Sequence, residues 1–413
     1  MTFRRRRLGG QPSTPQSVST PGSEAADYEW VDTQDVFNDL VTHALSAERI
    51  AVDTEFHRER TYWPRVALLQ IAVENNIFLV DPLEVDLKPL EAVLDSDVLW
   101  VMHASSQDLE VMERACGVIP RHLFDTQIAA GFAGMSTPSL SALVERYVGH
   151  RLPKGDRLTD WFERPLRPTQ RDYAASDVLY LFELHDRLTA DLEQRGRLDW
   201  ATTESDPSSW YTKPTLPVEL AWTRIKEARH LRGSARCVAS VLAEWRERTA
   251  QNKDLPTRFI LSDLALVGVA QRAPKNSEEL KGVRGLDGRY MKDRAADEIL
   301  SLVAEGLRRP SEDVPTLDIE EGPKLDKELR AAVTLVSAWV SQVAKDESLD
   351  PALLATRADI TDLLRGSKNA RLSTGWRVDL VGNRIQDLVT GRAAVAFDPR
   401  GGLVLEPRVR REN

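Results

Sequence analysis

The stretch Ile50-Ala-Val-Asp-Thr-Glu-Phe56 has the pattern of a buried strand whose last residues are acidic. Successive side chains of a strand point to opposite faces, so Asp53 and Glu55 are expected to project from the same face. An Asp-x-Glu pair also occurs at strand ends that merely face water. The pair alone therefore predicts a strand with an acidic end and leaves open whether that end is a functional site.

The segments around this strand predict an α/β fold. Apolar runs at 66–73 and 77–80 are separated by Glu74-Asn75-Asn76, a hairpin signal, and residues 98–102 predict a fourth strand. Helical periodicity is found at residues 36–45, 106–115, 126–133, 140–148 and 170–193. Strands joined by short turns, followed by strands that alternate with helices, predict a mixed sheet flanked by helices.

A chain of 413 residues is too long for a single core, and its composition divides it into segments. Strand signals stop after Trp200, and three X-Pro pairs at 204–217 predict a linker. Helical periodicity dominates from there to about residue 390. We predict a disordered tail at 1–26, an α/β domain at 27–203, an all-α block at 217–309, an acidic linker at 310–324, a second all-α block at 325–393 and a C-terminal tail at 394–413.

Composition excludes several classes of protein. The only cysteines, Cys116 and Cys237, exclude a disulfide framework and a cysteine zinc site. No apolar run approaches the roughly 18 residues of a membrane helix, and no secretory signal follows the arginines at 4–7, so a cytoplasmic location without membrane contact is expected. The net charge is −9, yet residues 217–309 hold 18 Lys and Arg against 13 Asp and Glu. That block can therefore face phosphates although the whole chain is acidic.

Three further residues extend the acidic pair. Asp108 lies near the start of the helix that follows the fourth strand, where a carboxylate is also favoured simply by the helix dipole. Tyr173 and Asp177 are four apart and share a helix face, although a tyrosine beside a surface acid is an ordinary pattern. Four converging carboxylates would repel one another unless cations neutralised them. Oxygen ligands favour two Mg²⁺ or Mn²⁺ ions, which about 4 Å apart can activate water and stabilise a leaving oxygen.

Three motifs resemble the DEDD exonuclease superfamily, tyrosine subclass: Asp53-Thr-Glu55, His103-Ala-Ser-Ser-Gln-Asp108 and Tyr173-Ala-Ala-Ser-Asp177. Residues 28–390 are similar to the bacterial ribonuclease D family, with supporting matches at 68–72, 124–127 and 158–170. The block near 218–306 resembles the helicase-and-RNase-D C-terminal (HRDC) domain, and the block near 326–393 resembles a diverged second copy. The resemblance implies a ribonuclease H-like fold and a 3′→5′ exoribonuclease that releases nucleoside 5′-monophosphates.

The resemblance also implies a role for each acid. Asp53 would bridge two cations, Glu55 and Asp177 would complete the site of the cation that activates water, and Asp108 would serve the second. Tyr173 would orient the attacking water. His103 lies five residues before Asp108, the spacing of the histidine subclass, but the order of the motifs gives that place to Tyr173. His103 is therefore expected to pack at the strand end and to hydrogen-bond locally.

Substrate contacts are less sharply indicated. Phe56 and Trp161 offer either faces for base stacking or ordinary core packing. Lys154, Arg157 and Arg164 are either phosphate ligands or solvated cations, and Gln70 and Gln127 are expected to support the site by hydrogen bonds. The candidate substrate-binding residues are Phe56, Gln70, His103, Lys154, Trp161 and Arg164.

The expected partner is RNA with a free 3′ end, and on family grounds a transfer RNA precursor. A DNA exonuclease of the proofreading type would need the same carboxylates, since only a contact to the 2′-OH separates the two substrates. A catalytically inactive RNA-binding protein would be expected to have lost metal ligands, and all four are present. Protein partners and oligomeric state stay open.

Overall fold

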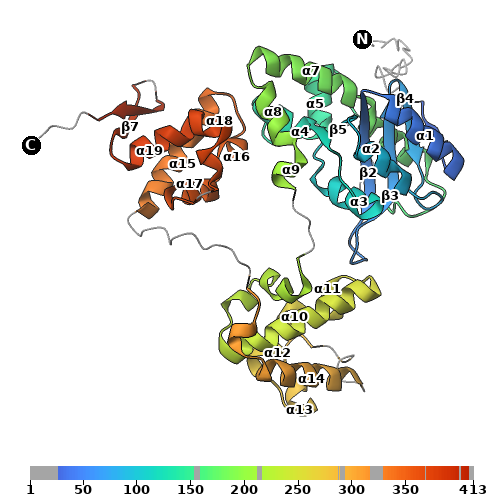
Figure 1. Ribbon diagram of the computed structural model, residues 1–413, viewed down its shortest axis with the longest axis vertical. Helices are drawn as coiled ribbons and strands as arrows, with labels where there is room; N and C mark the ends of the chain where they lie inside the picture. The colour runs from blue at the N-terminus through green and yellow to red at the C-terminus, as the bar shows by residue number, and fades with distance from the viewer. Residues whose placement is uncertain are drawn as a thin grey trace, which may run out of the picture.

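The computed structural model describes residues 27–152, 159–211, 216–286, 288, 294–316, 329–367, 369–399 and 401–408. An α/β domain is followed by a helical bundle and then by a second helical bundle (Figure 1). The second bundle lies beside helices α4 and α8 of the α/β domain, and the first lies below the loop between β2 and β3. The predicted fold class, a mixed sheet flanked by helices and then two helical blocks, is confirmed.

A six-stranded sheet of order β1-β4-β3-β2-β5-β6 forms the centre of the α/β domain. Its strands are β1 (Glu29–Val31), β2 (Arg49–His57), β3 (Arg65–Val73), β4 (Asn76–Val80), β5 (Leu99–Met102) and β6 (His122–Asp125). Strands β2, β3 and β4 form an antiparallel meander, and β1, β5 and β6 each run parallel to a neighbour. Sequence analysis does not predict β1 or β6, because Glu-Trp-Val and His-Leu-Phe-Asp each hold only two apolar residues, whereas the equally short β5 (Leu-Trp-Val-Met) is entirely apolar.

Helices cover both faces of this sheet. One face buries Ile50 and Val52 of β2 against helices α1 (Gln34–Ser46), α2 (Glu91–Leu94) and α3 (Ser106–Cys116). The opposite face buries Ala51 and Leu68 against α4 (Thr126–Phe132), α6 (Pro168–Leu179) and α7 (Leu181–Gln194). Helix α5 (Leu140–Leu143) continues as a π-helical turn, η2 (Val144–Val148). The helix predicted at 170–193 is broken, because Tyr180 leaves helical geometry between α6 and α7.

The first helical bundle surrounds the long helix α10 (Gly233–Lys253). The 3₁₀ segment η3 (Val218–Arg224) and the helices α11 (Thr257–Ile260), α12 (Asp263–Arg272), α13 (Ser277–Lys281) and α14 (Arg294–Arg308) complete it. The start of the predicted acidic linker also belongs to this bundle. Val314 is buried in its core, and the Trp222 indole donates to the Pro315 carbonyl at 2.8 Å.

The second helical bundle shares a hydrophobic core with the α/β domain. Its helices are α15 (Leu329–Asp346), α16 (Pro351–Leu354), α17 (Arg357–Leu364), α18 (Gly375–Arg377) and α19 (Asn383–Val389). Trp376 stacks on Trp200 of α8 (Leu198–Ser205), with centroids 4.9 Å apart and planes at 12°. Arg377 and Arg371 both pair with Glu204, also on α8. This bundle is therefore docked on the α/β domain.

Two predicted segments need correction. The linker expected at 204–217 begins as helix, because α8 runs to Ser205 and α9 (Pro207–Trp210) follows it. The tail expected at 394–413 contains an antiparallel hairpin of β7 (Ala393–Phe397) and β8 (Leu403–Pro407). In the sequence, Asp398-Pro-Arg-Gly-Gly402 is a turn signal between two apolar runs. In the described ranges, no helix is both long enough and apolar enough to cross a membrane.

Candidate active site

One pocket of about 820 Å³ receives the ends of β2, α3 and α6. Its lining includes all five residues predicted to be catalytic, Asp53, Glu55, Asp108, Tyr173 and Asp177. Strand alternation places Asp53 and Glu55 on the sheet face that α6 covers, since Ala51 of the same face belongs to the core under α6. The register between β2 and β3 shifts at Glu55 and Phe56, where β2 leaves the regular sheet.

Three of the acids form a tight group. Carboxylate oxygens of Asp53, Glu55 and Asp177 all lie within 4.8 Å of one another. Burial raises the pKa of Asp53 well above its ordinary value, and the negative charges of Asp177, Asp108 and Glu55 raise it further. A buried carboxylate surrounded by carboxylates is stable in its charged form only with a cation nearby. The donor set, made only of carboxylate oxygens, suits a hard divalent cation.

Asp108 approaches from another direction. It lies on the first turn of α3, is 7% exposed, and is not part of the group of three. The Thr54 hydroxyl donates to its carboxylate at 2.5 Å. Burial raises the pKa of Asp108 to about 6, although the hydrogen bond from Thr54 acts to lower it. Asp108 thus reaches the same pocket from the α3 side of β2.

Tyr173 lies one helical turn before Asp177 on α6, as its spacing predicts. Its ring packs at 38° against the ring of Trp161, with centroids 6.1 Å apart. Trp161 is itself 4% exposed and lies in the core. The prediction that Trp161 binds substrate is therefore wrong, because its faces are covered. Trp161 instead supports Tyr173.

Asp125, which sequence analysis did not single out, fixes the backbone at the edge of the pocket. Its carboxylate accepts hydrogen bonds from the amides of Ala104, Ser105 and Gln127 at 2.8 to 3.0 Å, and from the Ser105 hydroxyl. Ala104 has a φ of 56°, a left-handed conformation that is costly for a residue with a side chain. Asp125 also caps α4, and an aspartate directly before a predicted helix is the signal that could have identified it.

His103 and Gln127 line the pocket and make local contacts. The Nδ1 atom of His103 lies 2.9 Å from the Thr126 hydroxyl, and burial lowers the pKa of the imidazole. The prediction that His103 hydrogen-bonds locally at the strand end is confirmed. The Gln127 amide donates to the Pro138 carbonyl at 3.0 Å, which holds the loop before α5 against the pocket.

The other predicted substrate contacts have different outcomes. Phe56 lines the pocket and stays a candidate. Gln70 is fully buried opposite Asp53 in the sheet and does not line the pocket, so the structure gives it no route to a substrate. Neither polar atom of its amide has a hydrogen-bond partner within the described ranges, so the expected supporting hydrogen bond is not found there. Lys154 and Arg157 lie outside the described residues.

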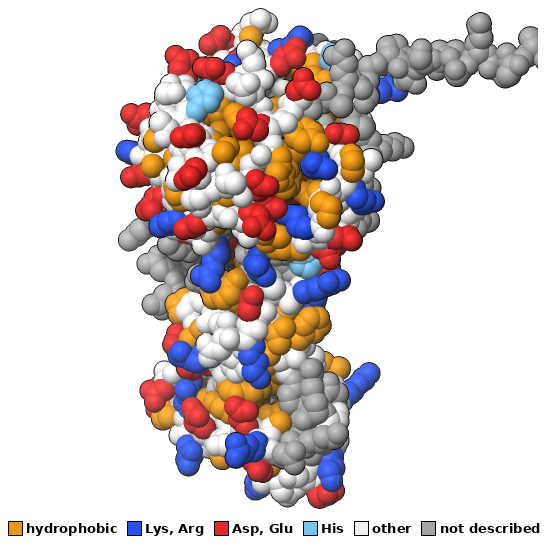
Figure 2. All heavy atoms as spheres, turned by 90° about the vertical axis from the view of Figure 1, so that its right-hand side faces the viewer, with side chains coloured by type: hydrophobic (Ala, Val, Ile, Leu, Met, Phe, Trp, Pro, Cys, Tyr) orange, Lys and Arg blue, Asp and Glu red, His pale blue; other side chains and the backbone are white. Residues whose placement is uncertain are grey.

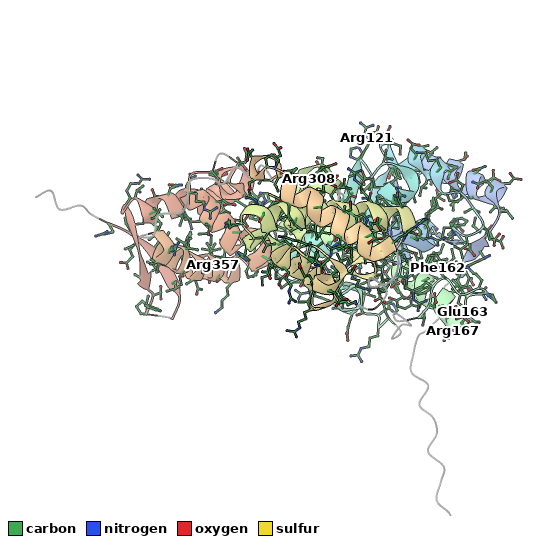
Figure 3. All side chains as sticks on the ribbon, turned by 90° about the horizontal axis from the view of Figure 1, so that it is seen from below. Arg121, Phe162, Glu163, Arg167, Arg308 and Arg357 are labelled. Carbon is green, nitrogen blue, oxygen red and sulfur yellow. The ribbon has the colours of Figure 1, made fainter. Side chains whose placement is uncertain are left out.

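Arg164 has a structural task. Its guanidinium donates to both carboxylate oxygens of the buried Asp81, at 2.6 and 2.8 Å, and to the Ala67 carbonyl at 2.7 Å. The prediction that Arg164 binds substrate is therefore wrong, because its guanidinium already donates to these partners and has no pair of N–H groups left to bind a phosphate. It ties the segment before α6 to β3 and to the loop after β4. The neighbouring residues Phe162, Glu163 and Arg167 lie together at one edge of the α/β domain (Figure 3).

Comparisons with known proteins agree with this geometry. A family model described as 3′-5′ exonuclease matches residues 28–193, and the HRDC domain model matches residues 235–303. Ribonuclease D of Sphingobium indicum is 36% identical over 357 residues, which are 84% of this chain and 90% of that relative. Ribonuclease D of Escherichia coli is 32% identical over 375 residues, which are 88% and 98% of the two chains.

Solved structures give the same result. The crystal structure of Escherichia coli RNase D matches with a TM-score of 0.78 at 31% identity, covering 88% of this chain and 99% of that one. The second helical bundle lies outside both family matches, so its origin as a second HRDC copy stays a prediction.

Proposed function

The chain belongs to the ribonuclease D family, and we propose that it is a 3′→5′ exoribonuclease that releases nucleoside 5′-monophosphates. The observation that carries this proposal is the group of three carboxylates within 4.8 Å, in a pocket that also holds Asp108 and Tyr173. The Escherichia coli relative is described as an exoribonuclease involved in structured RNA processing. Transfer RNA precursors with a free 3′ end are the substrates we propose for this chain.

Asp53, Glu55, Asp177 and Asp108 would hold two divalent cations, Mg²⁺ or Mn²⁺. Such cations supply Lewis-acid activation of water and stabilisation of the leaving oxygen in phosphodiester hydrolysis. Asp53 is suited to the shared position, because the charges that act most on it are those of the other three acids. Carboxylates held by a strand and two helices need little reorganisation when charge develops in the transition state.

The remaining pocket residues act on water and substrate. The Tyr173 hydroxyl would orient the attacking water, with its ring held in place by Trp161. Phe56 would offer a stacking face to a terminal base. Figure 2 shows acidic side chains gathered over the α/β part of one face and basic side chains below them, toward the first bundle. The body of the RNA would therefore avoid that acidic surface and contact the first bundle, whose block carries the basic excess.

The test compares one RNA labelled at its 5′ end with the same RNA labelled at its 3′ end, in Mn²⁺, in Mg²⁺ and in EDTA. We expect a ladder of shortened 5′-labelled products and immediate release of a labelled mononucleotide from the 3′ end. Asp53→Ala should abolish both, whereas Asp97→Ala, which changes an exposed acid, should not. Activity in EDTA or in Asp53→Ala would contradict the mechanism. Equal degradation of a DNA of the same sequence would favour a general 3′→5′ exonuclease.

A further inference from the structure

Thr54 lies between the two acids of β2 and faces the other side of the sheet. Its side chain is 5% exposed and points toward α3, where its hydroxyl donates to Asp108 at 2.5 Å. A hydrogen bond from a hydroxyl to a charged carboxylate is short and strong compared with one between neutral groups. One strand therefore presents two carboxylates on one face and holds a third carboxylate through its opposite face.

Asp108 is set apart from the other three acids. Asp53, Glu55 and Asp177 already form a group within 4.8 Å, which does not include Asp108. Asp108 lies on a different element and is nearly buried, so rotation of its side chain would take it out of register with the pocket. The Thr54 hydroxyl bonds one carboxylate oxygen of Asp108, and backbone hydrogen bonds from Asp108 and Thr54 also favour the charged carboxylate.

We infer that Thr54 is a positioning residue that controls binding of the second cation. It holds Asp108 in the orientation that this cation requires, while the group of three carboxylates binds the first cation without help from Thr54. The inference rests on the proposed two-cation function. It goes beyond that function because it makes binding of the second cation depend on a side chain that is not itself a metal ligand.

The experiment is titration of the full chain with Mn²⁺, followed by calorimetry and by the electron paramagnetic resonance signal of free Mn²⁺. Thr54→Val keeps the shape of the side chain and removes the donor, and Thr54→Ser restores it. Thr223→Val is the matched control, since Thr223 is a buried threonine of the first bundle whose hydroxyl donates to a backbone carbonyl. Wild type should bind two ions. Thr54→Val should bind the first unchanged and the second at least about tenfold more weakly.

The outcomes separate the inference from the proposed function. A wild-type chain that binds fewer than two ions overturns the two-cation function itself. Two ions bound with unchanged affinities in Thr54→Val overturn the positioning role, and so does equal weakening of both ions, which would indicate general loss of structure. Rescue by Thr54→Ser, with Thr223→Val like wild type, supports the inference. If Thr54→Val does not fold, Thr54→Ala carries the same expectation.

A separate observation concerns the rings of His150 and Tyr180, which stack with centroids 5.5 Å apart and planes at 19°. Tyr180 follows Asp177 by three residues and lies just past the end of α6, where the chain turns into α7. His150 comes two residues before Leu152, which lines the pocket with Ser176 and Asp177. Along the chain, each ring is therefore two or three residues from a residue that lines the pocket.

The two rings differ in exposure. Tyr180 is half-buried against the core of the α/β domain, whereas His150 is exposed. The exposed His150 ring is therefore held in place by the half-buried Tyr180 ring. We propose that this pair is a stacking platform for a base of the single-stranded 3′ segment, upstream of the nucleotide that is removed. Stacking on aromatic rings tolerates any base, which suits an enzyme that removes successive nucleotides. This proposal also rests on the proposed function.

The probe is a set of RNAs with 2-aminopurine at successive positions from the 3′ end, bound to the Asp53→Ala chain so that they are not consumed. One position should be quenched on binding, and His150→Ala should remove that quenching and raise KM at least about fivefold. His150→Phe should retain the quenching. His122→Ala, which changes an exposed histidine of β6, is the control. Identical quenching in His150→Ala overturns the platform, whereas failure of the wild-type site to bind any RNA overturns the proposed function.

Discussion

Two acids of the α/β domain, the buried Asp81 and the half-buried Asp53, show opposite ways of accommodating a carboxylate away from water. Asp81 is neutralised by Arg164 through two hydrogen bonds. Burial raises the pKa of Asp53, and the negative charges of three other carboxylates raise it further. A charge that the protein itself pairs is structural, whereas one left among like charges requires a ligand. The contrast identifies the ligand site without reference to any motif.

Arg164→Ala tests the structural half of this contrast. Removal of the guanidinium leaves the Asp81 carboxylate buried without its partner, which should cost about 3 kcal/mol of unfolding free energy. KM for RNA should stay within about twofold of wild type, because the side chain is engaged away from the pocket. Urea unfolding and steady-state kinetics measure the two quantities. Arg151→Ala, which breaks an exposed ion pair, is the control. A raised KM with unchanged stability would reinstate Arg164 as a phosphate ligand.

The substitution Tyr173→Phe tests the other half of the contrast, the proposed ligand site. The ring should stay packed on Trp161, and only the hydroxyl that would orient water is lost. We expect kcat to fall by about 100-fold with little change in KM or in thermal stability. Tyr147→Phe removes a hydroxyl that is hydrogen-bonded to Asp191 and should leave kcat unchanged. A normal kcat in Tyr173→Phe would remove the hydroxyl from the mechanism.

The acidic residues could be predicted from the sequence, whereas several of their neighbours could not. The spacings of Asp53 with Glu55 and of Tyr173 with Asp177 translate directly into strand and helix faces, and the pocket contains all of them. Trp161 and Arg164 were misassigned because a ring or a guanidinium looks the same in a sequence whether a neighbour covers it or not. That depends on Tyr173 and Asp81, which are brought there by the fold.

At the scale of elements, apolar content decided which strands of the six-stranded sheet the sequence revealed. The long strands β2 and β3 carry enough apolar residues to be recognised, but β1 and β6 are short and gain their hydrogen bonds from distant partners. The hairpin of β7 and β8 was missed although two apolar runs flank its turn signal, and its strands are only half-buried in the structure. Helices α6 and α7 share one continuous period, and only the backbone at Tyr180 separates them.

Asp125 joins three elements, and its replacement should disturb all of them. Asp125→Ala removes the cap of α4 and the acceptor for the turn between β5 and α3. We expect a loss of at least about 2 kcal/mol in unfolding free energy, more than the roughly 1 kcal/mol of a single exposed cap. Activity should fall as well, because the turn that precedes Asp108 is released. Asp206→Ala, which removes the exposed cap of α9, is the control. Equal losses in the two variants would show that the turn needs no acceptor.

At the scale of the molecule, the two bundles are attached in different ways. The first contacts the loop between β2 and β3 mainly through polar groups: the Tyr62 hydroxyl donates to Glu247 at 2.5 Å, and Asp254 accepts from the Tyr62 and Trp63 amides. The second shares an apolar core with α4 and α8. Arg308 and Arg357 lie on the two different bundles (Figure 3). The second bundle is therefore a fixed extension of the α/β domain.

Glu204 connects this docking to pH. Burial alone would raise the pKa of Glu204, but hydrogen bonds and charge from Arg377 and Arg371 outweigh it and leave the pKa below its ordinary value. A carboxyl group with a lowered native pKa contributes stability that is fully present above its unfolded pKa of about 4.3 and is lost as pH falls through the native pKa. The docked bundle should therefore be unaffected between pH 8 and 6 and should loosen only in acid.

Glu204→Gln removes this dependence. The variant should be less stable than wild type at pH 7, because Arg377 is left nearly buried without its anion. The difference between the two should start to shrink as pH falls below about 4.3 and should vanish below the lowered native pKa, where the wild-type carboxyl group is neutral as well. Hydrogen exchange of α16 and α18, measured from pH 7 to 3.5 and corrected for the intrinsic rate, reports the docking directly. Glu145→Gln, at an exposed ion pair, is the control. A difference that stays constant with pH would mean that apolar packing of Trp376 on Trp200 holds the bundle and that Glu204 contributes no charge to it.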